Sequence, residues 1–186
     1  MSLISKIQSL ISSANVVTGE SRTDLTSAVQ DLKDGYGGSA VEKGLVFSEY
    51  DSDGYPHKAE FVGTWTEIPS NYANSLLFSW GRNITLRIPA TVTRVGVNAF
   101  SYCGNTGATA VIYEGNPPII EQNTFSNSPK ITLYDFSHAT SVPTLYSVNS
   151  LGHANGCVIK VPQSLLSTWQ NETNWSALTN VVWQGV

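Results

Sequence analysis

Apolar and polar residues alternate along residues 84–88, so that Ile84, Leu86 and Ile88 fall on one face of an extended segment. Strict alternation of this kind is typical of a half-buried β-strand. Pro89 follows directly and ends the expected strand, because proline has no N–H to donate to a sheet ladder. A turn and a short helical or irregular segment then return five further residues to the same core, and these are Val92, Val95, Ala99, Phe100 and Cys103. This stretch cannot bury its apolar side alone, so we expect it to stack on similar units.

Similar units recur along the middle of the chain. Expected strands begin near residues 84, 111, 131 and 158, a spacing of roughly 20–27 residues that is typical of a repeat architecture. Phe125 corresponds to Phe100, and Ile120 corresponds to Val95, at the same offset along the chain. We therefore expect repeats over about residues 65–162, with short parallel strands.

The two ends of this region have different patterns. Residues 44–64 are expected to form a β-hairpin, with an Asp-Gly turn between its strands. The Asp-Ser-Asp-Gly sequence from Asp51 also resembles the beginning of a calcium loop, but the later acidic ligands of such a loop are missing, which favours the turn. Residues 163–186 have the pattern of a helical segment followed by a strand, which suits a cap on the last repeat.

Residues 1–38 form a separate module that ends in a Gly-rich joint. Two short amphipathic helices are expected here, and such helices are not stable alone. We therefore predict an attachment or oligomerisation module, whereas the other interpretation is a helical cap lying on the domain of residues 39–186. The residues expected to dock are Leu3, Ile7, Leu10, Ile11, Leu25, Val29 and Leu32.

Composition and charge exclude several classes of function. The formal net charge of −4 argues against non-specific nucleic-acid binding, which needs a basic surface. No apolar run approaches the ~20 residues that a membrane span requires, and polar residues interrupt the apolar N-terminus as they would not in a secretory signal. We therefore expect no nucleic-acid partner and no membrane insertion. Two cysteines, Cys103 and Cys157, are too few for a disulfide framework; we expect free thiols, and a bridge between them stays open.

The sequence contains no pattern of a catalytic centre. His57, His138 and His153 lie far apart, and none has a second ligand at metal-binding spacing. The acidic residues of the expected hairpin could place two carboxylates at glycosidase spacing, although any acidic hairpin does this. We therefore predict a non-enzymatic protein without metal or cofactor, and keep a glycan hydrolase as a third interpretation.

Two stretches resemble known proteins. The pattern from Ile88-Pro89 through Val92, Val95 and Gly96 to Ala99-Phe100 and Cys103 resembles the repeat of BspA-like leucine-rich repeat proteins. The stretch from Ile7 to Gly37 resembles the start of tail or baseplate structural proteins from phages of Gram-positive bacteria. Together the resemblances imply an α+β fold. It would comprise a short N-terminal helical hairpin, then a small leucine-rich-repeat-type solenoid with a hairpin cap at its start and a helical and strand cap at its end.

The resemblances imply a non-enzymatic virion protein of the tail, baseplate or fibre. Its helices would bind other virion proteins and form a homo-oligomer, such as a trimer, while its repeat domain would bind a host cell-surface glycan or protein. The alternative is a bacterial BspA-like adhesion or protein-interaction module, which would be expected to carry a secretion signal. The candidate receptor-binding residues are Arg87, Arg94, Tyr102, Tyr113 and Tyr134.

Overall fold

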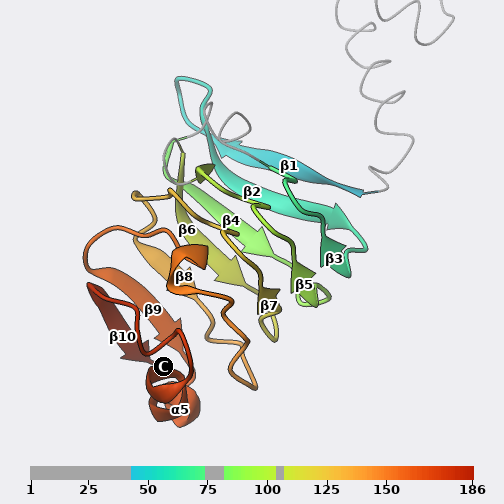
Figure 1. The fold of residues 1–186 in the computed structure, drawn as a ribbon. Helices are drawn as coiled ribbons and strands as arrows, with labels where there is room; N and C mark the ends of the chain where they lie inside the picture. Colours follow the sequence, from blue (N-terminus) through green and yellow to red (C-terminus); the bar gives the residue numbers. More distant parts are fainter. Residues whose placement is uncertain (1–42, 74–81, 104–106) are drawn as a thin grey trace, which may run out of the picture. The chain divides into compact units, whose positions relative to one another are not determined.

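A computed structural model describes residues 43–73, 82–103 and 107–186 (Figure 1). The chain divides into two units, Met1–Gly44 and Leu45–Val186, and the described residues belong almost entirely to the second. The expected helical module of residues 1–38, with all of its predicted docking residues, lies outside the described residues.

Most of the regular secondary structure of the described residues is sheet (Figure 1). The large sheet contains, in spatial order, β1 (Lys43–Tyr50), β2 (Pro56–Gly63), β4 (Ile84–Ile88), β6 (Ala108–Tyr113), β8 (Leu133–Asp135), β9 (Cys157–Val161) and β10 (Val181–Gly185). The small sheet contains β3 (Glu67–Ile68), β5 (Arg94–Val95) and β7 (Ile119–Ile120). The helical elements in the described residues are the 3₁₀ turns η1 (Val148–Ser150) and η2 (Gln163–Leu165) and the α-helix α5 (Leu166–Asn171).

The first strand of the large sheet differs from the others in direction. A turn joins β1 to β2, in which Gly54 N–H donates to the Asp51 carbonyl, and the two strands run in opposite directions (Figure 1). From β2 onward, all neighbouring strands of the large sheet are parallel. The expected turn at Asp51 is confirmed, because its carboxylate accepts the N–H groups of Asp53 and Tyr55, both at 2.9 Å.

The strand register stacks apolar side chains into one core. In the large sheet the aligned inward row is Ala59, Leu86, Val111, Tyr134 and Ile159, all buried. In the small sheet Ile68, Val95 and Ile120 align in the same way and are fully buried. From β2 to β8 the chain alternates between the two sheets. The buried residues of both sheets belong to a single cluster. Burial of these aligned rows is the main source of stability for the fold.

The predicted fold class is wrong. The described residues do not form an α+β protein with a leucine-rich-repeat-type solenoid; they form a seven-stranded mixed sheet, a small parallel sheet and one short α-helix. The segment after Gly96, which was open to a helical interpretation, consists mainly of turns. Asn98 and Tyr102 there have left-handed φ angles of 54° and 66°, which are incompatible with a continuing α-helix. Near the C-terminus, α5 is only six residues long, and the expected second helical stretch at residues 173–178 lacks helix.

Aromatic residues fill the core in a continuous series of ring contacts. Phe100 and Phe125 stack with centroids 5.3 Å apart, and Phe125 meets Tyr134 edge-on at 5.6 Å. At the end of the sheet, Trp169 and Trp175 contact each other at 5.4 Å. Most of these rings therefore serve packing, which leaves few aromatic side chains for the surface.

Candidate functional site

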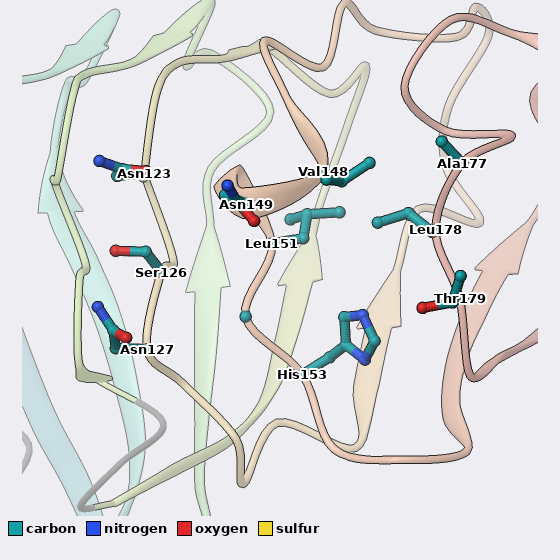
Figure 2. A pocket seen from close by; sticks show the side chains of 11 residues that line it. Asn123, Ser126, Asn127, Val148, Asn149, Leu151, His153, Ala177, Leu178 and Thr179 are labelled. Atoms are coloured by element: carbon teal, nitrogen blue, oxygen red, sulfur yellow. The ribbon is translucent and has the colours of Figure 1, made fainter.

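The candidate site is a polar groove in the part of the molecule where the turns between strands stack on one another. It has a volume of about 470 Å³. Its lining residues are Asn123, Ser126, Asn127, Val148, Asn149, Leu151, Gly152, His153, Ala177, Leu178 and Thr179 (Figure 2). Most of these side chains are amides, hydroxyls or apolar groups, an arrangement that suits a polar but uncharged ligand.

Backbone hydrogen bonds hold the segments of the groove side by side. Phe100 N–H donates to Thr124 O, and Tyr102 N–H donates to Ser126 O, both at 2.8 Å. On the other side, Phe125 N–H donates to Ser150 O at 2.8 Å. Three segments, 98–102, 123–127 and 148–153, thus lie next to one another at the spacing of neighbouring strands, about 4.8 Å. The site is built on these paired backbones and not on a free loop.

Left-handed backbone conformations shape the turns of this groove. Asn123 and Asn127 both have φ of 55°, a region that asparagine enters more readily than other non-glycine residues. Figure 2 shows Asn123, Ser126 and Asn127 projecting from their segment on the side away from Thr179. These turns therefore present a row of polar side chains next to the segment that carries Tyr102.

The floor of the groove depends on close packing at Gly152. A Cβ at this position would lie 2.4 Å from the carbonyl oxygen of Phe125 and 2.5 Å from the Ser128 backbone nitrogen, closer than atoms approach. The Gly152 carbonyl also accepts a hydrogen bond of 2.8 Å from the buried hydroxyl of Tyr134. Leu151 and Leu178 add a buried apolar surface. The groove therefore has a floor fixed by the core.

Tyr102 extends the groove at one side. A second hollow of about 410 Å³ is lined by Tyr102, Ser128 and Pro129 and shares Asn127, Gly152 and His153 with the first. The Tyr102 side chain is 47% exposed, unlike most aromatic residues of the core. It offers an aromatic face next to the amides.

His153 lines both the groove and the hollow beside Tyr102. Its Nδ1 lies 3.0 Å from the carbonyl oxygen of Ala154. Because a carbonyl only accepts, Nδ1 carries the proton in the neutral ring, which leaves Nε2 as an acceptor. In Figure 2 the imidazole lies on the side of its segment that faces Leu178 and Thr179.

The five predicted receptor-binding residues have three different environments. Tyr102 lies at the groove. Arg94 forms ion pairs with Glu67 at 2.5 Å and Glu121 at 3.1 Å, and Arg87 forms one with Glu114 at 3.3 Å, so both arginines link neighbouring segments.

The predictions for Tyr113 and Tyr134 are corrected by their burial. Tyr113 is 1% exposed and Tyr134 is fully buried, because both lie on inward positions of parallel strands. Burial raises the pKa of each tyrosine hydroxyl, and the neighbouring Cys103 adds to the effect. Neither side chain can contact a receptor.

Sequence reasoning missed the amides and hydroxyls that line the groove. A signal was present, since Asn98 and Asn123 share the repeat offset, as do Tyr102 and Asn127. Single polar residues in turns are common, however, and only the backbone pairing shows that these form one surface.

Comparison with known proteins found no matching family model, curated protein or solved structure. Within the described ranges no group of three or more His, Cys, Asp or Glu side chains is placed to hold a metal ion. Among the same residues, none of the helices has the length and apolar character needed to cross a membrane.

Proposed function

We propose that this protein is a non-enzymatic virion component, of a tail, baseplate or fibre, that binds a host-surface glycan through the polar groove. One observation carries the glycan assignment. The same groove combines amide and hydroxyl side chains, an apolar floor and the exposed ring of Tyr102. The virion assignment is supported by the resemblance of the N-terminal stretch to phage structural proteins.

The groove matches the chemistry of a sugar. Hydroxyl groups both donate and accept hydrogen bonds, and Asn127, Asn149 and Thr179 can do the same. The C–H faces of a sugar ring are apolar and pack against aliphatic or aromatic surfaces, which the half-buried Val148 and the exposed Tyr102 supply. A single groove of this kind binds weakly, and many copies on a particle would raise the avidity by multivalency.

Variants of two groove residues test the proposal. Tyr102→Ala removes the aromatic surface, and Asn127→Gly removes the amide while keeping a residue that tolerates the left-handed backbone. We expect each to weaken binding of the full chain to purified host wall polysaccharide by roughly tenfold, about 1.4 kcal/mol. Binding would be measured by biolayer interferometry, with circular dichroism to verify folding.

The matched control is Tyr50→Ala. Tyr50 is also exposed, at 61%, but lies on β1 and is not among the lining residues of the groove. Its loss should leave binding unchanged. Wild-type protein that binds no host polysaccharide, or groove variants that bind as well as wild type, would overturn the proposal.

The virion assignment has a separate test. Removing residues 1–34 should prevent incorporation of the protein into particles without preventing glycan binding by the remaining chain. Incorporation can be followed by immunoblotting of purified particles. A truncated protein that still assembles would contradict attachment through this stretch.

A further inference from the structure

We propose that the groove binds an uncharged, linear glycan that lies across the three segments 98–102, 123–127 and 148–153, with about one sugar residue on each. This inference rests on the proposed function and adds the class and the direction of the ligand. It comes from two features of the described residues, their charge and their spacing.

The first feature is the absence of Asp, Glu, Lys and Arg from the described lining residues of the two hollows. Arg94 pairs with Glu67 and Glu121 on the small sheet. Lys130 follows the lining residue Pro129 and is exposed, but is not itself among the lining residues. Proteins that bind phosphate or carboxylate groups usually use Arg or Lys for charge-assisted hydrogen bonds. A wall polymer rich in phosphate or uronate would find neither Arg nor Lys among these lining residues, whereas a neutral sugar needs none.

The second feature is the regular spacing of the segments. Their backbones are hydrogen-bonded, so neighbouring segments are about 4.8 Å apart and the outer two about 10 Å apart. One sugar ring adds a comparable length to an extended oligosaccharide. A glycan lying across the segments can therefore place successive rings over successive segments, whereas a glycan lying along one segment would contact only one.

Corresponding positions on these segments, Tyr102, Asn127 and Gly152, line the same hollow. Tyr102 on the first segment corresponds to Asn127 on the second, and their backbones are joined through the bond from Tyr102 N–H to Ser126 O. Gly152 and His153 follow on the third segment and share a hollow with both. Ala177, Leu178 and Thr179 lie beyond the third segment in Figure 2. The polar row is thus about three sugar residues long.

Calorimetry of the full chain with oligosaccharides of defined length tests this inference. The probes are uncharged chito-oligosaccharides and cello-oligosaccharides of one to six units, and anionic oligogalacturonates of the same lengths. We expect affinity for an uncharged series to rise at least tenfold from one to three units and to change less than twofold from three to six. Affinity for the anionic series should be at least tenfold lower at every length. Tyr102→Ala should reduce the gain on lengthening, while Tyr50→Ala should preserve it.

The outcomes separate this inference from the proposed function. Tighter binding of oligogalacturonates, an affinity independent of length, or no binding of either uncharged series would overturn the inference. If wall polysaccharide still binds in a manner sensitive to Tyr102→Ala, the proposed function stands without it. If neither oligosaccharides nor wall polysaccharide bind, both fail.

Discussion

Two buried tyrosines, Tyr113 and Tyr134, differ in what their hydroxyl groups contact. The Tyr134 hydroxyl donates to the Gly152 carbonyl, whereas Tyr113 Oη is buried and has no hydrogen-bond partner among the described residues. A buried polar group without a partner destabilises the fold by about 1–3 kcal/mol, while a satisfied one contributes about 0.5–1.5 kcal/mol. The hydroxyl group of tyrosine thus lowers the stability of the fold in one strand and raises it in the neighbouring strand.

Replacing each tyrosine by phenylalanine should separate these effects. Tyr113→Phe removes an unsatisfied hydroxyl and should leave the free energy of unfolding unchanged or raise it by up to about 1–3 kcal/mol. Tyr134→Phe leaves the Gly152 carbonyl without its donor and should lower the free energy of unfolding by about 1 kcal/mol. Urea denaturation monitored by circular dichroism measures both values.

Tyr134→Phe should also weaken glycan binding, because Gly152 forms part of the groove floor. Tyr113→Phe should not affect binding. A loss of stability in Tyr113→Phe that equals the loss in Tyr134→Phe would show that the Tyr113 hydroxyl has a partner, and would contradict this account.

At the scale of elements, the alternation of apolar and polar residues and the position of proline predict strands well. They do not predict the conformation of the segments that connect the strands. Expected strand starts near 84, 111, 131 and 158 lie close to the first residues of β4, β6, β8 and β9. Strands of the small sheet are only two residues long, too short to show a period. The predicted fold class is wrong because the short strands and turns that join the strands of the large sheet show no periodicity. Likewise the sequence identifies Tyr102 as a candidate binding residue because it lies in an expected turn. The amide residues beside it form one surface with it only through backbone pairing between distant segments, which the sequence does not reveal.

The small sheet carries an ion-pair row whose contribution can be predicted. Arg94 lies between Glu67 and Glu121 on neighbouring segments, but its side chain is 44% exposed and its charge is screened by solvent. Arg94→Met should therefore lower the free energy of unfolding by less than about 1 kcal/mol. Most of this difference should disappear in 1 M NaCl, and glycan affinity should match wild type.

Thermal and urea denaturation at low and high salt would measure the effect. The comparison variant is Phe125→Ala, which removes a fully buried ring that stacks on Phe100. It should lower the free energy of unfolding by about 3–5 kcal/mol, whatever the salt concentration. If Arg94→Met instead lowers the free energy of unfolding by several kcal/mol at every salt concentration, the ion pairs of Arg94 are shielded from solvent and this account is wrong.

At the scale of the described unit, both sheets share one apolar core that contains ionisable groups. Burial raises the pKa of the Cys157 thiol to about 12, against an ordinary value of 9.0, and burial also raises the pKa of Tyr113 and Tyr134. The folded state therefore keeps these groups protonated at a pH where the unfolded chain releases their protons. Their contribution to stability is fully present below pH 9 and is lost as the pH rises toward 12.

Alkaline conditions should accordingly destabilise the protein. We expect the melting temperature to fall progressively between pH 9 and pH 11.5, and Cys157→Ala to reduce the slope without abolishing it. Differential scanning fluorimetry across this range measures the slope. A melting temperature that stays constant to pH 11.5, or a slope unaltered by Cys157→Ala, would show that the thiol does not ionise on unfolding in this range.

The left-handed turns that carry the groove have a consequence for how its specificity can diverge. At Asn123 and Asn127, with φ of 55°, the backbone favours Asn, Asp and Gly over other residues. Ser126, Asn149 and Thr179 line the same surface and are absent from the positive-φ residues, so their side chains are free of that restriction. New ligand preferences should therefore arise first at these three positions. A mutant library randomised there should retain folded members far more often than one randomised at the two asparagines.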